Sequence, residues 1–364
     1  MERVHFENLD ALRFLAAFAV MGEHITRSFY FPDTPWQNAF IILLSMDGAG
    51  AELGVNFFFV LSGFLISYLL IKEFESTGTL QLKRFYVRRT LRIWPLYFIS
   101  LLIGFVIHPA LDNSLTELAD WKMYVTFLTN FDHIYFKWPQ SGILGVQWSL
   151  AVEEQFYLLW PVLIFMLLKR KRILPVVLIV LIVFSLVYKL SGGHKYHTFS
   201  CLAPLMTGSL LAYGCYYFPE RVTKLTSRLT RQSTLLIYGL SLALIFFQYK
   251  ISRQILFYHD LIFVYLLLFS AFVIVDQNYA QRSFYKFGKL KILTQLGKLS
   301  YGIYLLHMVS ITIVLYLSSE FDLSFWGWML VIFGLTFVLA FCGYHIVEKP
   351  FLNLKSKFNS SDLS

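Results

Sequence analysis

Apolar stretches of about 20 residues recur along this sequence, and their recurrence restricts the possible fold more than any other feature. Hydrophobic residues make up 57% of the 364 residues and charged residues only 15%, against about 25% charged residues in a typical soluble domain. A soluble fold of this length has too little interior to bury so much apolar surface. The sequence therefore predicts an all-α integral membrane protein that crosses the bilayer many times.

The hydropathy pattern predicts a bundle of about ten transmembrane helices. The predicted spans cover residues 9–29, 52–71, 92–111, 148–168, 173–190, 200–217, 234–250, 258–275, 293–316 and 325–346. A shorter apolar segment, 121–131, is interpreted as an interfacial or re-entrant element. We expect residues 1–351 to form one membrane domain and residues 352–364 to form a polar cytoplasmic tail.

The basic residues predict the orientation of these spans. Of the 31 Lys and Arg residues, 23 fall in the N-terminal segment, in alternate loops and in the C-terminal segment, whereas six fall in the intervening loops. Cytoplasmic loops are enriched in Lys and Arg, so both termini are expected in the cytoplasm. Because the net charge of +9 is spread over short loops, it does not indicate a nucleic-acid partner.

The first predicted span contains LDALRFLAAFAVMGEH, residues 9–24, which is unusually rich in charged and titratable groups for a membrane helix. A helix would place Arg13 and His24 on one face, about 16 Å apart along its axis, with Arg27 one turn further on. Ionisable groups in a bilayer usually face a cavity or a partner. Two interpretations remain open: a functional stripe, or a packing histidine beside a snorkelling arginine.

A second group of titratable residues lies in WSLAVEEQFYLLWP, residues 148–161. With the predicted orientation, Glu153 and His24 lie about five residues below the outer surface, in spans that run in opposite directions. A carboxylate that orients an imidazole is the pairing that a general base requires, and Tyr157 follows Glu153 by one turn. The alternative is an ion pair between Arg27 and a glutamate that holds two helices together.

A third group lies in RFYVRRTLRIWP, residues 84–95, on the predicted cytoplasmic side. A helix would bring Arg88, Arg89 and Arg92 close together, and Pro95 predicts the first turn of the third span. Arginines beside the free N–H groups of a helix N-terminus form an anion site suited to phosphates. The alternative is ordinary positive-inside charge or contact with lipid headgroups.

Three further segments carry weaker signals. LSYGIYLLH contains Tyr304 and His307, and YHIVEKPF contains Glu348, which could pair with the arginines; both segments are interpreted as packing or support. The long segment 112–147 combines acids, amides and aromatic residues that suit a sugar-like acceptor, although an ordinary interfacial loop fits equally well. No metal-ligand spacing or glycine-rich nucleotide loop occurs, so no metal is expected.

In these motifs the chain closely resembles the bacterial membrane acyltransferase family 3. The family has a motif of a basic residue, ten further residues and then His, which corresponds to Arg13 and His24. Its R-x-x-R motif corresponds to Arg89 and Arg92. Three further motifs match in order: W-S-L-x-x-E-x-x-F-Y at residues 148–157, S-Y-G-I-Y-x-x-H at 300–307 and E-x-P at 348–350. Five motifs in order, spread over residues 9–351, make the resemblance specific. Phe14 departs from the pattern, because a glycine often follows the arginine, and this position bears on helix packing.

The resemblance implies an O-acyltransferase of the bacterial inner membrane that transfers an acyl group from cytoplasmic acyl-CoA, with acetyl-CoA expected, to a sugar or lipid-linked glycan. His24 would be the base or a transient acyl carrier, with Glu153 orienting it. The remaining candidates are Arg13, Arg88, Arg89 and Arg92 for acyl-CoA, and Trp148, Tyr157, Tyr304, His307 and Glu348 for substrate binding or support. Membrane lipids are expected neighbours, and a homo-oligomer is left open.

The main alternative is a multi-pass transporter or flippase of a glycolipid or anionic solute. Transporters often show repeats with interrupted helices in matching halves, and none is evident in the sequence. A membrane sensor or scaffold has no feature in its favour. No soluble hydrolase-like domain follows the last predicted span, so transfer to the acceptor is expected within the membrane domain or through a separate partner.

Overall fold

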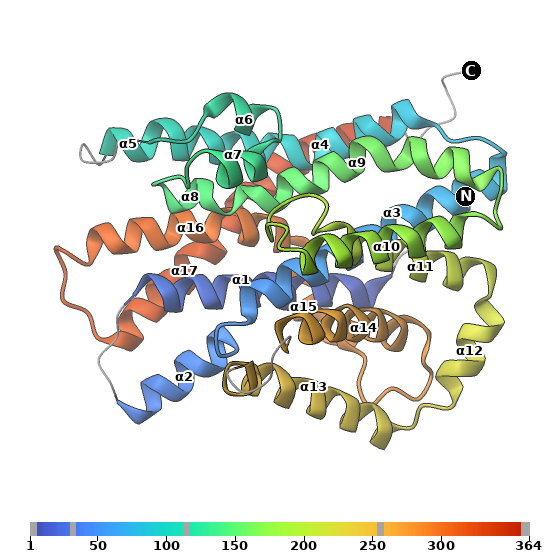
Figure 1. The fold of residues 1–364 in the computed structure, drawn as a ribbon. Helices are drawn as coiled ribbons and strands as arrows, with labels where there is room; N and C mark the ends of the chain where they lie inside the picture. The colour runs from blue at the N-terminus through green and yellow to red at the C-terminus, as the bar shows by residue number, and fades with distance from the viewer. Residues whose placement is uncertain (1–5, 30–33, 112–116, 253–257, 358–364) are drawn as a thin grey trace. The chain divides into compact units, whose positions relative to one another are not determined.

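A computed structural model describes residues 6–29, 34–111, 117–252 and 258–357, and every regular element in these ranges is a helix (Figure 1). The chain divides into two compact units. Unit 1 contains residues 1–72, 170–193 and 199–300, and unit 2 contains residues 73–169, 194–198 and 301–364. Each unit is built from segments that lie far apart in the sequence.

In the part of the chain that the structure describes, six helical segments are long and apolar enough to cross a membrane: Pro35–Thr77, Leu82–Ala110, Gly142–Leu168, Asp260–Tyr279, Ser300–Leu317 and Phe325–Leu354. The pair Pro219–Ser227 and Arg231–Phe247, bent by 91°, would make a seventh. Helix α1 (Glu7–Ser28) is not among them because its interior carries Arg13, Glu23 and Arg27. The all-helical, multi-pass character is thus confirmed within the described residues, whereas the number of ten spans and the sides of the termini stay predictions.

Unit 1 is organised around α1. Its helices are α1, α2 (Pro35–Ser45), α3 (Gly50–Thr77, through residue 72), α10 (Leu174–Leu190), α11 (Leu202–Tyr217), α12 (Pro219–Ser227), α13 (Arg231–Ser252), α14 (Tyr258–Tyr279), η2 (Phe287–Lys289) and α15 (Lys291–Lys298). Helix α1 packs along α15 and α2 (Figure 1). Asn8 fixes its start, since its Nδ2 donates to Gln277 O at 2.8 Å and its Oδ1 accepts from Gly288 N at 2.9 Å. These contacts hold α1 to the end of α14 and to η2.

Helices α3 and α11 approach each other backbone to backbone. A Cβ atom on Gly63 would lie 1.9 Å from Leu205 O, and one on Gly208 would lie 1.9 Å from Val60 O, so neither position has room for a side chain. Small residues at such crossings let membrane helices pack closely. One turn further on, Ser67 Oγ donates to Ser209 Oγ at 2.8 Å. Lipid tails could not provide a hydrogen-bond partner for either hydroxyl.

Unit 2 contains the remaining helices. These are the end of α3, then α4 (Leu82–Leu102), η1 (Ile103–Ile107), α5 (His108–Leu111), α6 (Trp121–Val125), α7 (Thr129–Tyr135), α8 (Gly142–Gly145), α9 (Gln147–Leu168), α16 (Ser300–Leu317, from residue 301), α17 (Phe325–Cys342), η3 (Gly343–Glu348) and α18 (Lys349–Lys357). Helix α4 contacts α8, α9, η3 and α18. Both η1 and η3 are π-helical turns, which often occur at functional sites.

The structure corrects the predicted start of the third span. Helix α4 begins at Leu82, and Pro95 lies inside it rather than in its first turn. Residues 82–94 contain no other helix breaker, so the helix extends upstream of the apolar run. Arg92 is therefore about 15 Å from the N-terminus of α4. The free N–H groups at that N-terminus cannot contribute to an anion site at Arg89 and Arg92.

Two other boundaries differ from the prediction. The expected span 293–316 is divided into α15, which ends at Lys298, and α16, which begins at Ser300. Helix α2 was not predicted at all, although Thr34 forms a capping box with Gln37 at its start.

The segment 121–131 and the predicted polar tail both contain short helices. Residues 121–131 contain α6 and the start of α7, neither long enough to cross a bilayer. Helix α18 continues into the predicted polar tail as far as Lys357, and residues 358–364 lie outside the described residues. Part of the proposed acceptor segment, residues 112–116, also lies outside them.

Candidate functional site

Helix α1 carries the predicted basic stripe without interruption from Glu7 to Ser28. Arg13 Nη1 lies 2.5 Å from Asp10 Oδ1, one turn earlier, and both side chains are mostly buried. His24 is partly buried near the other end of the helix. Continuity of the helix preserves the spacing on which the sequence prediction rested, since 11 residues at 1.5 Å each span about 16 Å.

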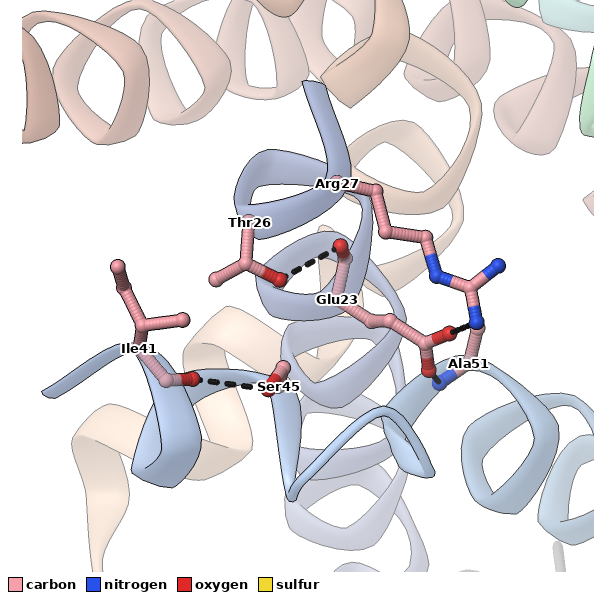
Figure 2. A network of polar contacts seen from close by, with 6 residues as sticks. All are labelled: Glu23, Thr26, Arg27, Ile41, Ser45 and Ala51. Atoms are coloured by element: carbon pink, nitrogen blue, oxygen red, sulfur yellow. Dashed lines mark hydrogen bonds and ion pairs between the residues drawn. The ribbon is translucent and has the colours of Figure 1, made fainter. Parts of the chain in front are cut away.

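Glu23, the neighbour of His24, joins α1 to the start of α3 (Figure 2). Its side chain forms an ion pair with Arg27 on the same helix, while its Oε2 accepts a hydrogen bond of 2.5 Å from the backbone N–H of Ala51. Glu23 is only 2% exposed. A carboxylate at a helix N-terminus satisfies a free N–H group and opposes the positive end of the helix dipole. Glu23 was not predicted as a site residue, although its i,i+4 spacing to Arg27 is typical of an ion pair within one helix.

In unit 2, the three predicted phosphate-binding arginines of α4 have different environments. The guanidinium of Arg89 lies 5.3 Å from the ring centroid of Tyr157 and 5.7 Å from that of Phe85. Arg88 interacts electrostatically with Glu73 and Arg84. Arg92 attracts the carboxylate of Glu348, the partner that the sequence suggested for this arginine group.

Two adjacent glutamates of α9 bind to aromatic residues on different elements. Tyr157 donates its hydroxyl to Glu153 Oε2 at 3.0 Å, and Trp94 of α4 donates Nε1–H to Glu154 Oε2 at 3.0 Å. Oε1 of Glu154 and Oε1 of Glu348 are buried and have no hydrogen-bond partner within the described part of the chain. The hydrogen bond between Trp94 and Glu154 depends on how α4 packs against α9, so the local sequence does not predict it.

Helix α16 connects these elements through two tyrosines. Tyr304 Oη lies 2.5 Å from Ser149 Oγ and donates to Val146 O at 3.1 Å, while Tyr301 donates to Ile93 O of α4 at 2.7 Å. Electrostatic interactions also link Tyr301 to Glu348, Glu154 and Glu153. Tyrosine hydroxyls that are bonded in this way hold α16 against α4 and α9.

His307 completes the supporting set from the sequence analysis. It is fully buried, and its Nδ1 lies 3.2 Å from Ile303 O one turn earlier on α16. A histidine held to its own helix backbone is consistent with the supporting role that its motif suggested. Trp148 likewise packs against an aromatic neighbour, with its ring centroid 4.5 Å from that of Tyr196.

The candidates thus fall into two sets. Unit 2 brings together the arginines of α4, the glutamates of α9, the tyrosines of α16 and Glu348 of η3. Arg13 and His24 belong to unit 1, and the structure describes the two units separately. The pairing of His24 with Glu153 and the shared binding of acyl-CoA by Arg13 and the α4 arginines therefore stay predictions. No group of three or more His, Cys, Asp or Glu residues in the described ranges is arranged to hold a metal ion.

Comparison with known proteins adds evidence that is independent of this geometry. The model of a family described as "Acyltransferase domain" matches residues 6–345. The chain is 26% identical to the peptidoglycan O-acetyltransferase OatA of Listeria monocytogenes over 374 residues, which cover 96% of this chain and 56% of that protein. It is 27% identical to the O-acetyltransferase OatA of Staphylococcus aureus strain NCTC 8325 over 363 residues, which cover 95% of this chain and 57% of that protein. The chain spans little more than half the length of these relatives. No solved structure matches it.

Proposed function

This chain belongs to the acyltransferase domain family, and from that premise we propose that it is a membrane O-acyltransferase. The donor is cytoplasmic acetyl-CoA, and the acceptor is a sugar hydroxyl of a cell-surface polysaccharide or of its lipid-linked precursor. Two relatives are named as O-acetyltransferases, one of them as a peptidoglycan O-acetyltransferase, and these names support the acetyl group and a polysaccharide acceptor.

The observation that carries the proposal is the uninterrupted α1 helix from Glu7 to Ser28. It holds Arg13 and His24 about 16 Å apart and within about 20° of one face. The pantetheine arm of CoA has a comparable length, so a donor whose phosphates lie near Arg13 presents its thioester near His24. The separation of Arg13 and His24 therefore suits a phosphorylated donor that enters from the cytoplasmic side and reacts close to the outer side of the membrane.

The arginines of α4 fit the phosphate end of this donor. Arg88, Arg89 and Arg92 lie within two helical turns, and all three are partly exposed. Guanidinium groups bind phosphate through two parallel hydrogen bonds, a geometry that lysine cannot reproduce. The attraction between Arg92 and Glu348 and the position of Arg89 over Tyr157 fix these side chains before the donor binds.

In the reaction, His24 removes the proton from the sugar hydroxyl as its oxygen attacks the thioester carbonyl. The C–O bond forms, the C–S bond breaks, and the imidazolium returns its proton to the departing CoA thiolate. Glu153, held by the Tyr157 hydroxyl, orients His24 and stabilises its cation. A second route passes through an acetyl group carried on His24 itself, which the acceptor hydroxyl then removes.

The test is transfer of radiolabelled acetyl groups from acetyl-CoA to a soluble peptidoglycan disaccharide by the full chain in proteoliposomes. We expect CoA release that depends on the acceptor, and a roughly 100- to 10,000-fold loss of rate in His24→Asn. Acetyl-CoA binding and thermal stability should be preserved in that variant. Quenching wild-type protein before acceptor is added separates the two routes, because only the second accumulates label on the protein.

A different outcome would reject the proposal. If His24→Asn, well folded, retained more than about half of the wild-type rate, histidine chemistry would be excluded. If wild-type protein released no CoA with any saccharide, yet moved a labelled glycolipid across the proteoliposome membrane, the transporter alternative would replace the enzyme.

A further inference from the structure

Residues 194–198 connect α10 to α11, both in unit 1, yet they pack within unit 2. Asn130 of α7, fully buried, donates from Nδ2 to Tyr196 O at 3.2 Å and to Thr198 Oγ1 at 3.1 Å. Thr198 in turn donates to Gln155 Oε1 of α9 at 2.5 Å, and Gln155 Nε2 donates to Asn130 Oδ1 at 2.9 Å. This closed set of hydrogen bonds fixes the loop against α7 and α9.

The fixed loop places Tyr196 in an aromatic group, here named the Trp138 cluster: His133, Trp138, Trp148 and Tyr196. The ring centroid of Tyr196 lies 4.5 Å from that of Trp148 and 5.4 Å from that of Trp138. The ring centroids of Trp138 and His133 are 4.4 Å apart. The indole of Trp138 also contacts Gly145, where an added Cβ atom would lie 3.6 Å from the ring. Trp138 nevertheless remains 48% exposed. The cluster is therefore a supported aromatic surface with one half-exposed ring.

Polar groups border this surface. Lys195 Nζ lies 4.9 Å from the Tyr196 ring centroid, and the ring of exposed His194 lies 5.2 Å from the same ring. Beneath Trp138, His133 is 8% exposed, its Nε2 lies 2.8 Å from the Tyr124 hydroxyl, and its Nδ1 has no hydrogen-bond partner within the described residues. Hydrogen-bonding groups thus lie both around and below the rings.

The Trp138 cluster also adjoins the proposed catalytic carboxylate. Trp148 directly precedes Ser149, whose Oγ lies 2.5 Å from the hydroxyl of Tyr304. That hydroxyl interacts electrostatically with both Glu153 and Tyr196. Tyr304 therefore interacts both with a residue of the Trp138 cluster and with the carboxylate proposed to orient the base, all within unit 2.

We propose that the Trp138 cluster is the acceptor subsite and that it binds a pyranose ring of the glycan, with Trp138 under the sugar and Lys195 and His194 at its hydroxyls. The axial C–H groups of a pyranose carry slight positive charge and pack against the negative face of an aromatic ring. The proposal rests on the O-acyltransferase function proposed above and specifies where its acceptor binds.

A lipid anchor is the competing use of aromatic residues near a membrane surface. Such anchors need only an amphipathic ring at the right depth, whereas this surface is held by a closed set of side-chain hydrogen bonds on two helices. Preorganisation of this kind lowers the entropic cost of binding a ligand in one orientation. It favours a saccharide with defined geometry over fluid lipid.

The test is equilibrium binding of a labelled peptidoglycan disaccharide to the full chain in nanodiscs, together with initial rates of transfer. Trp138→Ala should weaken saccharide binding and raise the acceptor KM by about tenfold, the change expected for one lost stacking contact. The KM for acetyl-CoA and the rate at saturating acceptor should stay within about twofold. Trp138→Phe should recover part of the affinity. Trp121→Ala is the matched control, because Trp121 is 59% exposed in α6 of the same unit and outside the cluster.

The outcomes separate the two proposals. Wild-type affinity in well-folded Trp138→Ala would reject the subsite and leave the transferase function intact. An equal loss in Trp121→Ala would also reject it. If Trp138→Ala changed insertion into lipid without affecting saccharide binding, the cluster would be a lipid anchor. Saccharide binding that depends on Trp138 without any acetyl transfer would retain the subsite and reject the proposed function.

Discussion

The carboxylate of Glu23 on α1 accepts a hydrogen bond from the backbone N–H of Ala51, the second residue of α3. One side chain therefore fixes the position of the α3 N-terminus against the helix that carries His24. Because Glu23 is buried and also paired with Arg27, loss of its side chain would leave the Ala51 N–H group without this acceptor in the protein interior.

We predict that Glu23→Ala lowers the free energy of unfolding by about 1–2 kcal/mol, the usual cost of losing a helix cap. Glu23→Gln should lose less, since the amide oxygen can still accept from Ala51. The matched control is Glu52→Gln in the same first turn of α3, where the side chain is 63% exposed and a small effect is expected. Thermal unfolding of the three variants in detergent measures the difference, and equal midpoints for Glu23→Ala and Glu52→Gln would contradict it.

The donor site predicts a second set of results. Arg89→Ala and Arg92→Ala should each weaken acetyl-CoA binding, and lysine at either position should restore it only in part, because an ammonium lacks the bidentate geometry. Lys83→Ala, an exposed change at the start of α4, serves as the control. Unchanged affinity in the double alanine variant, measured by isothermal titration, would assign these arginines to topology or packing.

Residues 121–138, which contribute His133 and Trp138 to the Trp138 cluster, should lose stability in acid. Burial, and then the charge of His194, lower the pKa of His133 to about 4, whereas an unfolded histidine titrates near 6.5. Between these values the unfolded segment takes up a proton that the folded segment excludes. Stability should therefore be constant above about pH 6.5 and should decrease as the pH falls toward 4.

Hydrogen exchange of residues 121–138 between pH 4 and pH 7.5 measures this effect. His133→Gln should reduce the acid-dependent loss, because glutamine can bond to Tyr124 without titrating. Burial raises the pKa of neighbouring Asp132, which acts in the opposite direction since its folded form takes up the proton first. The comparison must therefore be between wild type and variant, and identical pH profiles would assign the loss to other groups.

Topology can be tested with cysteines placed at Ser191 and Ser227, both exposed. The basic-residue distribution predicts that Ser191→Cys reacts with an impermeant maleimide added outside intact cells and that Ser227→Cys does not. Exposed Cys342 should first be replaced by serine, whereas Cys201 and Cys215 are buried. The reverse pattern of labelling would invert the donor and acceptor sides.

The helices were largely predictable, because a chain in lipid must satisfy its own backbone and apolar runs therefore become helices. Every expected interval contains helix in the described residues. The break between α15 and α16 was not predicted; Gly297, in the last turn of α15, lies against the backbone of Asp10, a contact with a distant segment. The start of α4 was misplaced because Pro95 is tolerated inside that helix.

Local contacts of the site were predictable and distant ones were not. Glu153 and Tyr157 are one turn apart, so their contact follows from helix geometry alone. Sequence periodicity does not relate Trp94 to Glu154, which form a hydrogen bond, or Tyr196 to Trp148, whose rings are in contact. The role of Glu23 lay between these cases, because its ion pair is local while its bond to Ala51 depends on packing.

The contact between α3 and α11 has a consequence for biosynthesis. Ser67 and Ser209, which form a hydrogen bond across it, are 142 residues apart, and helices α4–α10 are made in the interval. Helix α3 must therefore stay in the translocation machinery or in lipid until the ribosome has produced α11. During this time the surface around Gly63, which α11 later covers, has no partner helix. Insertion factors that shield such a helix would act during this interval, and truncations that end before residue 202 should leave nascent chains that are selectively degraded.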